Sequence, residues 1–278
     1  KRSDSYQSEA ALEQEFIRLL CEQGYEYLPI HTEKDLIANL RKKLAELNNY
    51  QFSDTEWEDF FKNAIANPNE HIVEKTRKIQ EDNIQVLTRD DGSSKNITLI
   101  DKKNIHNNRL QVINQYKVNA ATDSSKDSLG CVIGTENGAK YNNRYDVTVL
   151  VNGLPLIHIE LKRRGVAIRE AFNQINRYQR DSFWAGYGLY EYVQIFVISN
   201  GTDTKYYSNS TRRNAEKEHD KQGSSKTRTS NSFEFTCFWA DANNRVIPDL
   251  IDFTKTFFAK HTILNILTKY CIFTSEDM

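Results

Sequence analysis

The sequence predicts an α/β (α+β) fold, in which a mixed β-sheet forms the core and helices flank it. Helix-like segments with apolar residues every three or four positions lie at both ends of the chain, and short strand-like runs fill its middle. The run Val193–Ser199 is almost entirely apolar, as expected of a central strand that is buried on both faces. Asn152 and Gly153 separate two further strand-like runs, which predicts a hairpin.

The composition is that of a globular chain with a proper core. The 278 residues are 38% hydrophobic and 27% charged, with a formal net charge of −1. These values exclude disordered, collagen-like and coiled-coil classes for the whole chain. No apolar run approaches the ~20 residues that span a bilayer, and the polar first fifteen residues exclude a signal peptide. We therefore expect no membrane partner, and because the chain begins with Lys1 we expect a fragment of a longer protein.

The cysteines and the overall charge narrow the class further. Cys21, Cys131, Cys237 and Cys271 lie far apart without a CxxC pair. This pattern disfavours a zinc ribbon and a disulfide-rich secreted scaffold, so we expect a reducing, cytoplasmic location. The near-zero net charge at first sight disfavours a nucleic-acid-binding domain, since such domains are usually basic.

The N-terminal quarter predicts helices. Ser8 can cap a first helix, which Gly24 ends. A short strand is expected over residues 25–30, and a further helix follows Asp54. The apolar faces of the first two helices repeat with helical spacing, at Leu12, Phe16, Leu19 and Leu20 and at Leu36, Leu40, Leu44 and Leu47. Residues 8–78 are thus expected to form a helical elaboration of the core.

The rest of the chain alternates strands with helices. A first pair of strands, 83–88 and 96–101, surrounds an Asp-Asp-Gly turn. The hairpin strands are Tyr145–Val151 and Leu156–Leu161, and because Leu-Pro follows the Asn-Gly pair we expect a turn longer than two residues. Polar residues 118–141 and 208–232 predict a long loop and a mobile loop. Helices are expected over 166–180 and, in two pieces, over about 248–270.

Several common catalytic motifs are absent from the sequence. It contains no GxxxxGK[ST] phosphate-binding loop, so this chain alone should not hydrolyse ATP. It also contains no GxGxxG, HExxH or GxSxG motif. The six histidines show no metal-like spacing, and His158, which lies inside a strand, is expected to be packed against its neighbours rather than to bind a metal.

The residues around the hairpin carry the chemistry. Glu160 and Lys162 are two positions apart on a strand and therefore point to the same side. Asp146 lies 14 residues earlier, and pairing the strands around Gly153 sets it across from Glu160. Two carboxylates and a backbone carbonyl make a hard-oxygen site suited to Mg²⁺. The lysine can hold or activate a water beside a phosphate.

Two other acid-x-lysine pairs are weaker candidates. The acids that could join Asp101 and Lys103 lie in the turn Asp90-Asp91 rather than on a partner strand, and are expected to point to solvent. Asp203 and Lys205 follow a strand within the turn composition Asn-Gly-Thr-Asp, which predicts a solvated hairpin end.

The simplest alternative for the favoured group is a surface salt bridge, but the helix that follows disfavours it. Gln174 and Tyr178 are four residues apart and share one helix face, although in isolation this pair could be an ordinary surface hydrogen bond. Cations beside paired acids suit a phosphodiester, because the acids hold a metal and the bases hold the DNA backbone. The cations in this region are Arg163, Arg164, Arg169, Arg177 and Arg180.

These residues resemble a known nuclease superfamily. Asp146, then Glu160-Leu161-Lys162, then Gln174-x-x-x-Tyr178 looks like the PD-(D/E)xK superfamily in its variety with a QxxxY motif. More closely, the stretch NRYDVTVLVNGLPLIHIELKRRGVAIREAFNQINRY is very similar to the N-terminal nuclease domain of HsdR, the restriction (motor) subunit of type I restriction–modification enzymes. Supporting similarity covers residues 6–25, 99–103, 196–203 and 253–261, so the resemblance spans most of the chain.

The resemblance implies a restriction-endonuclease-like mixed sheet and a Mg²⁺-dependent hydrolase that cuts DNA. It matches Asp146 and Glu160 to the metal-binding acids, with the carbonyl of Leu161 as a further metal ligand. Lys162 matches the catalytic lysine of the family.

The resemblance also covers positions outside this group. Gln174 and Tyr178 match the QxxxY pair, which is implied to act near DNA or to support the active site. The family often has a glutamate near the metal on its first core helix, and both Glu9 and Glu13 are candidates here. Tyr145 stands where the motif's name has proline, a position that the superfamily keeps only loosely.

The resemblance also implies partners that this chain does not contain. In the family, motor domains that follow the nuclease domain pump double-stranded DNA with ATP, and none of their motifs is present here. Cleavage is implied to depend on the assembled complex with methyltransferase and specificity subunits. We expect a single endonuclease domain over residues 1–278 with its sheet core at about 84–206. The alternatives are a catalytically silent DNA-binding or assembly module of the same fold, and a related repair nuclease.

The charge distribution agrees with a nuclease once it is examined locally. Between Glu160 and Arg180 six lysines and arginines accompany two acids, a local excess of four positive charges in a chain of net charge −1. The near-zero total therefore excludes only a uniformly basic binder. We expect a positive patch beside the proposed cleavage centre.

Overall fold

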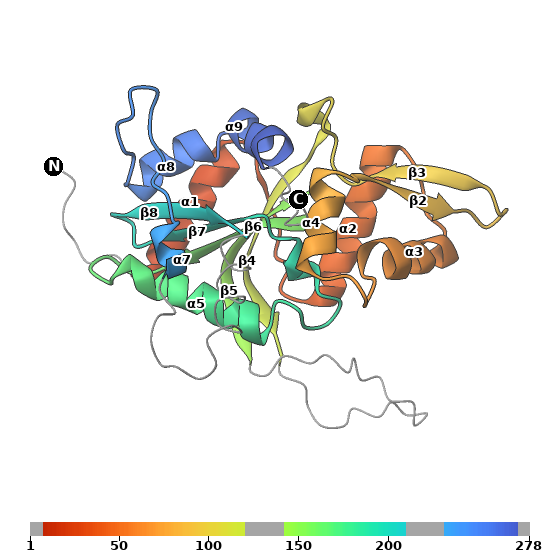
Figure 1. Cartoon of the computed structure of the whole chain (residues 1–278), viewed down its shortest axis with the longest axis horizontal. Helices are drawn as coiled ribbons and strands as arrows, with labels where there is room; N and C mark the ends of the chain where they lie inside the picture. The colour runs from red at the N-terminus through yellow and green to blue at the C-terminus, as the bar shows by residue number, and fades with distance from the viewer. Residues whose placement is uncertain (1–7, 120–141, 210–230, 272–278) are drawn as a thin grey trace.

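A mixed β-sheet forms the centre of the molecule (Figure 1). The computed structural model describes residues 8–119, 142–209 and 231–271. Its main sheet has six strands in the order β1-β4-β5-β6-β7-β8, and β2 and β3 form a separate two-stranded sheet. The strands are β1 Glu26–Tyr27, β2 Ile84–Thr88, β3 Ser94–Thr98, β4 Leu110–Val118, β5 Asn143–Val151, β6 Leu154–Leu161, β7 Ile195–Ser199 and β8 Thr204–Ser208. The predicted α/β class with a mixed sheet is confirmed.

Helices cover the sheet, with α5 on one side of it and α1 on the other (Figure 1). The pairs β1–β4 and β6–β7 are parallel and the other neighbours are antiparallel. The helices are α1 Glu9–Glu22, α2 Glu33–Asn48, α3 Asp54–Phe60, η1 Phe61–Ile65, α4 Ile72–Gln80, η2 Ile105–Asn107, α5 Ile168–Asp181, η3 Leu189–Tyr192, α7 Asn231–Glu234, α8 Leu250–Phe257, α9 Lys260–Asn265 and η4 Ile266–Tyr270.

The N-terminal helices form where the sequence predicts them. The Ser8 hydroxyl accepts a hydrogen bond from the Ala11 N–H at 3.1 Å and caps α1. Gly24 follows the helix with a φ of +87°. A capping box, in which Ser53 and Glu56 bond each other's backbone N–H, begins α3. The strand expected over residues 25–30 is shorter, since only Glu26–Tyr27 pairs with β4.

Most of the later elements also match their predictions. The two C-terminal helices and the buried strand β7 are present. The loops expected over 118–141 and 208–232 lie almost entirely outside the described residues, as does Cys131. The three described cysteines are free thiols: Cys21, Cys237 and Cys271. Among the residues with a described position, no helix has the length and apolar character needed to cross a bilayer.

The turn between β5 and β6 is tighter than expected. Val151 pairs directly with Leu154, which leaves Asn152 and Gly153 as a two-residue turn. Their φ values of +53° and +86° fit the left-handed conformation that such hairpin turns require. The expectation of a longer turn was therefore wrong, because Pro155 lies inside β6 and does not extend the loop.

A β-bulge then shifts the register of this hairpin by one residue. If the register beyond the bulge, in which Val147 pairs with Ile159, is continued by one residue, Asp146 lies across from Glu160. In the register next to the turn, Asp146 would instead lie across from Ile159, whose side chain points to the other face. The bulge therefore puts both acids on one face of the sheet. The pairs are Val151–Leu154 and Leu150–Pro155 before the bulge, and Val149–Ile157, Thr148–His158 and Val147–Ile159 after it.

Candidate active site

Asp146 and Glu160 meet at the end of the hairpin, where the ladder between β5 and β6 stops. Beyond the last pair, Val147–Ile159, the Leu161 N–H donates to Asp146 Oδ2 at 2.9 Å. Asp146 is 8% exposed and Glu160 is 0% exposed. A surface salt bridge, the simplest alternative, does not describe this pair because both acids are buried.

Lys162 joins the two acids to the first helix. Its Nζ lies 3.3 Å from Glu160 Oε1 and 3.6 Å from Glu9 Oε1. Glu160 and Lys162 thus point to the same side, as their spacing predicts. The structure brings Glu9 to this lysine, whereas Glu13 accepts hydrogen bonds from two side-chain amides of β4, Asn114 at 2.6 Å and Gln115 at 2.5 Å.

The electrostatics of the pair are unfavourable without a further cation. Burial and the neighbouring charge of Glu160 raise the pKa of Asp146 to about 8. Burial also raises the pKa of Glu160 to about 8, although Lys162 opposes the shift. The negative charge of Glu9 raises the pKa of both acids further. One ammonium therefore faces three carboxylates.

The donor atoms fit a hard cation. Glu160 Oε2 is buried and has no hydrogen-bond partner among the described residues. Its polar neighbour His158 Nε2 lies 3.4 Å away, and burial lowers the pKa of this imidazole to about 4, so the ring is neutral and supplies no counter-charge. A buried carboxylate oxygen without a partner is a site where a divalent cation would remove a large desolvation cost.

The Leu161 carbonyl can complete this donor set. The N–H and C=O of one strand residue point to the same side, and the Leu161 N–H points to Asp146. Its carbonyl oxygen is thus directed toward β5 as well. The possible metal ligands here are the carboxylates of Asp146 and Glu160 and the Leu161 carbonyl. No cluster of three or more His, Cys, Asp or Glu suited to a metal occurs in the described ranges.

His158 is packed, as expected, and does not belong to a histidine cluster. Its side chain is fully buried in the sheet. Four aromatic rings lie edge-on to it, those of Tyr145 at 5.5 Å, Phe183 at 5.6 Å, Tyr178 at 6.2 Å and Tyr190 at 6.4 Å between centroids. This aromatic packing keeps water away from the buried side of Glu160.

Gln174 and Tyr178 form a hydrogen-bonded pair on α5. Gln174 Nε2 donates to the Tyr178 hydroxyl, which in turn donates to the Arg144 carbonyl at 2.9 Å. Tyr178 is only 2% exposed, so this is not an ordinary surface hydrogen bond. Arg144 precedes Asp146 by two positions, and the pair therefore ties α5 to the start of β5.

Tyr145 provides a second connection between the same two elements. Its hydroxyl lies 2.6 Å from Ser182 Oγ, and its ring packs 4.8 Å from that of Tyr178. A side chain at the position named for proline thus anchors β5. Sequence reasoning did not identify Ser182 or the Arg144 carbonyl, although the tyrosines that reach them are visible in the sequence.

The five arginines lie on the surface beside this site. Arg180 forms an ion pair with Asp181 at 3.1 Å, which offsets its positive charge. The Arg169 guanidinium lies 4.6 Å from the centre of the Phe233 ring. The other three, Arg163, Arg164 and Arg177, lie on α5 and the loop before it. Arg163, Arg169, Arg177 and Arg180 are exposed and Arg164 is partly exposed.

The rival acid-x-lysine pairs have other roles. Asp101 accepts hydrogen bonds from the backbone N–H groups of Lys103 and Asn104 and so shapes a turn. Asp203 ends the turn between β7 and β8, as the predicted hairpin end requires, and Lys205 donates to Thr236 Oγ1 at 3.2 Å.

Comparison with known proteins shows which proteins this chain resembles. The model of a family described as type I restriction enzyme R protein N terminus matches residues 6–215. The chain is 47% identical over 278 residues to the type I restriction enzyme EcoprrI endonuclease subunit of Escherichia coli, which covers 100% of this chain and 78% of that protein.

Two staphylococcal proteins are also similar. The type I restriction enzyme SsaAORF53P endonuclease subunit of Staphylococcus saprophyticus is 34% identical over 277 residues. The SauMW2ORF169P endonuclease subunit of Staphylococcus aureus is 33% identical over 278 residues. Each match covers 98% of this chain but 25% of the relative, so the chain spans a quarter of these longer proteins.

Proposed function

Because the chain belongs to the family of type I restriction enzyme R protein N termini, we propose that it is the Mg²⁺-dependent DNA endonuclease domain of a type I restriction enzyme. The names of its relatives support a restriction endonuclease role. The observation that carries the proposal is the buried carboxylate pair of Asp146 and Glu160 with Lys162 beside it. This arrangement suits the hydrolysis of a phosphodiester.

In this proposal Asp146, Glu160 and the Leu161 carbonyl hold the metal. A bound Mg²⁺ supplies Lewis-acid stabilisation of the negative charge that develops on the phosphate. Lys162 keeps its ammonium between two carboxylates and can orient a water for attack on phosphorus. Hydrolysis adds this water across one P–O bond, which leaves a phosphate on one fragment and a hydroxyl on the other.

The surrounding residues position these groups. Glu9 is a second carboxylate at ion-pair distance from Lys162 and helps to hold its ammonium. Gln174 and Tyr178 fix the backbone just before Asp146. Arginines of α5 and its preceding loop, at positions 163, 164, 169, 177 and 180, contact the DNA backbone, because exposed guanidinium groups bind phosphates with bidentate geometry.

We further propose that the domain works within a larger cytoplasmic enzyme. The staphylococcal relatives are about four times as long as the matched region, which leaves room for motor domains outside this chain. ATP-driven translocation by such domains would deliver double-stranded DNA to the site. Methyltransferase and specificity subunits would complete the complex and choose the DNA sequence.

Substitutions in the full enzyme test the assignment. Asp146→Ala, Glu160→Ala or Lys162→Ala should each reduce DNA cleavage to background, because each removes a metal ligand or the lysine, while ATPase and translocation persist. Asp203→Ala and Lys205→Ala are matched controls from a rival acid–lysine pair and should leave cleavage intact. Persistent cutting by all three site variants would sink the assignment.

Metal binding separates this enzyme from a silent module of the same fold. Calorimetric titration of the chain with MgCl₂ should show one binding event that disappears in Asp146→Asn. A chain that binds duplex DNA but shows no Asp146-dependent uptake of Mg²⁺ would instead be a docking module. Progressive shortening of linear DNA by the full enzyme, without internal nicks, would indicate a repair exonuclease.

A further inference from the structure

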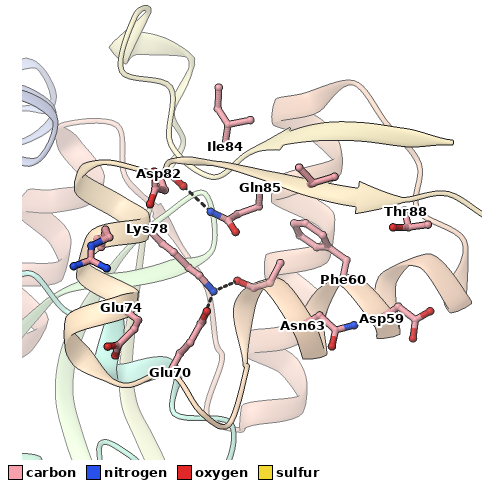
Figure 2. Close-up of a pocket in the computed structure, with 13 residues that line it drawn as sticks. Asp59, Phe60, Asn63, Glu70, Glu74, Lys78, Asp82, Ile84, Gln85 and Thr88 are labelled. Atoms are coloured by element: carbon pink, nitrogen blue, oxygen red, sulfur yellow. Dashed lines mark hydrogen bonds and ion pairs between the residues drawn. The ribbon is translucent and has the colours of Figure 1, made fainter.

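An acidic groove lies between α3, α4 and the strand β2 (Figure 2). Its volume is about 610 Å³. Two cationic side chains, Arg77 and Lys78, line the groove. Lys78 is buried, and its ammonium contacts the Glu70 carboxylate and the Ala64 carbonyl. Four carboxylates line the groove together with the ring of Phe60: Asp59, Glu70, Glu74 and Asp82. The groove is therefore negative, with an aromatic floor.

The outer edge of β2 runs along this groove. Asn83 accepts a backbone hydrogen bond from Leu99, and Arg89 donates one to Ser93. Hydrogen-bonded pairs alternate along an antiparallel ladder, so the odd-numbered residues of β2 bond to β3. The N–H and C=O groups of the even-numbered residues point away from β3. These residues are Ile84, Val86 and Thr88.

The opposite edge of the same two-stranded sheet supports this assignment. Thr98, which pairs with Ile84, exchanges two hydrogen bonds with the side-chain amide of Asn48 on α2. The outward groups of β3 thus meet a helix. Among the described residues no hydrogen bond is recorded for the outward backbone groups of Ile84, Val86 or Thr88. Such an edge can accept another strand.

The side chains at this edge indicate which strand it would accept. Ile84 is 52% exposed and Val86 is 62% exposed, and both line the rim of the groove. Figure 2 shows the Ile84 side chain pointing away from the helices, and Val86, two positions later on the strand, shares its face. Gln85 points to the other face, toward Lys78 and the acidic groove (Figure 2). An added strand would therefore place alternate side chains against an apolar face and against carboxylates.

We propose that β2 binds an extended segment of a partner protein in which aliphatic residues alternate with lysine or arginine. Its backbone would bond the outward groups of Ile84, Val86 and Thr88, and its aliphatic side chains would cover Ile84 and Val86. Its basic side chains would face the groove carboxylates. The negative groove disfavours DNA as the occupant, since phosphates are repelled there.

A designed peptide tests the proposal on the full chain. The probe is fluorescein-labelled Ser-Lys-Val-Arg-Val-Lys-Val-Ser, and its counterpart has glutamate at the three basic positions. Fluorescence anisotropy should show saturable binding of the basic peptide only. Asp59→Asn together with Asp82→Asn should weaken binding severalfold and flatten its dependence on salt, because both remove negative charge from the groove.

A proline on each edge separates strand addition from simple charge attraction. Val86→Pro removes an outward N–H without removing a bond to β3, and should weaken peptide binding by at least about tenfold. Asn96→Pro is the matched control, because Asn96 pairs with Val86 and its N–H points to the other edge; it should leave binding unchanged.

Thermal unfolding of both variants checks that the fold persists. No binding of the basic peptide to the unsubstituted chain overturns the proposal. Equal losses in Val86→Pro and Asn96→Pro, or displacement of the peptide by duplex DNA, overturn it as well. If Val86→Pro unfolds the chain, the backbone contact is tested instead by methylating the amide nitrogens of the peptide. Undiminished binding of that methylated peptide overturns strand addition.

Discussion

Asp146 and Glu160 carry the principal energetic cost of the site. Folding raises the pKa of each acid mainly through burial, and the charge of Glu160 adds to the rise for Asp146. Between about pH 4, where free carboxyl groups titrate, and pH 8, the folded chain therefore binds more protons than the unfolded chain. Its stability must fall as the pH rises through this window. The buried pair therefore lowers the stability of the metal-free chain at neutral and higher pH.

This cost predicts that the stability of the unsubstituted chain depends more strongly on pH than that of Asp146→Asn. In metal-free buffer, the free energy of unfolding should fall more steeply from pH 5 to pH 8 for the unsubstituted chain than for Asp146→Asn, because the variant lacks one of the repelling charges. Urea unfolding at several pH values measures it, and Mg²⁺ should flatten the slope of the unsubstituted chain. Parallel slopes in the two proteins would contradict the proposed repulsion.

A second prediction concerns the bracing residue Tyr178. Tyr178→Phe removes the hydroxyl that links Gln174 to the Arg144 carbonyl, and should cost about 1 kcal/mol of stability. We expect the cleavage rate at saturating DNA to fall while the Kd for DNA changes little, because the hydroxyl positions β5 and does not contact phosphate. Tyr270→Phe, at a 73% exposed tyrosine, should change neither quantity. A loss of DNA affinity alone in Tyr178→Phe would argue for direct DNA contact.

At the scale of elements, the turn of the β5–β6 hairpin is fixed by its contact with α2. Gly153 has a φ of +86°, and an added Cβ would lie 2.6 Å from Leu40 Cα. Gly153→Ala should therefore destabilise the fold by clearly more than the ~1 kcal/mol typical of alanine at a positive φ. Gly92→Ala isolates the steric part, because Gly92 has a φ of +79° but nothing within 4 Å of its Cβ position.

Chemical denaturation of both glycine variants measures this difference. Equal losses of unfolding free energy in Gly153→Ala and Gly92→Ala would show that α2 can move away from the hairpin. A much larger loss in Gly153→Ala would confirm that the close approach is part of the fold.

The hairpin also shows how far sequence reasoning reaches. Centring the pairing on Gly153 predicts the correct partner for Asp146, although the turn itself is shorter than expected. The tight turn moves the register by one residue in one direction, and the bulge at Leu156 moves it back. The side-chain alternation that groups Glu160 with Lys162 is a local property and was predictable, whereas the bulge depends on packing against neighbouring strands.

Elements held by remote partners were not predicted. Strand β4 mixes apolar and polar residues, and its Gln111 is buried because its side chain bonds Glu26 and Asn39 from distant segments. Similarly, spacing alone could not choose between Glu9 and Glu13, which are one helical turn apart. The choice follows from where α1 meets Lys162 and the amides of β4.

At the scale of the whole molecule, a buried ion pair joins the N-terminal helices to η3, the short helix that precedes β7. Lys75 of α4 is 2% exposed, and its Nζ lies 2.8 Å from Glu191 Oε2 and 3.0 Å from the Gly188 carbonyl. Lys75→Ala would leave Glu191 buried without its ammonium partner, with only the exposed His71 ring 3.8 Å away. We expect a loss of about 3–5 kcal/mol.

An exposed pair on α1 provides the comparison. Arg18 and Glu22 form an ion pair in which both side chains are 57% exposed, so Arg18→Ala should cost at most about 1 kcal/mol. Unfolding by urea, followed by circular dichroism, measures both variants. Similar losses in the two variants would mean that α4 is not anchored through Lys75.

The position of the site within the hairpin has a consequence for the order of folding. Asp146, Glu160 and Lys162 lie within 17 consecutive residues, whereas Glu9 is 153 positions from Lys162. Hairpins close within about 1–10 μs, while contacts between distant segments form later. A nascent chain would thus assemble both carboxylates with the lysine before α1 docks. The contact of Glu9 with Lys162 then reports that α1 has docked.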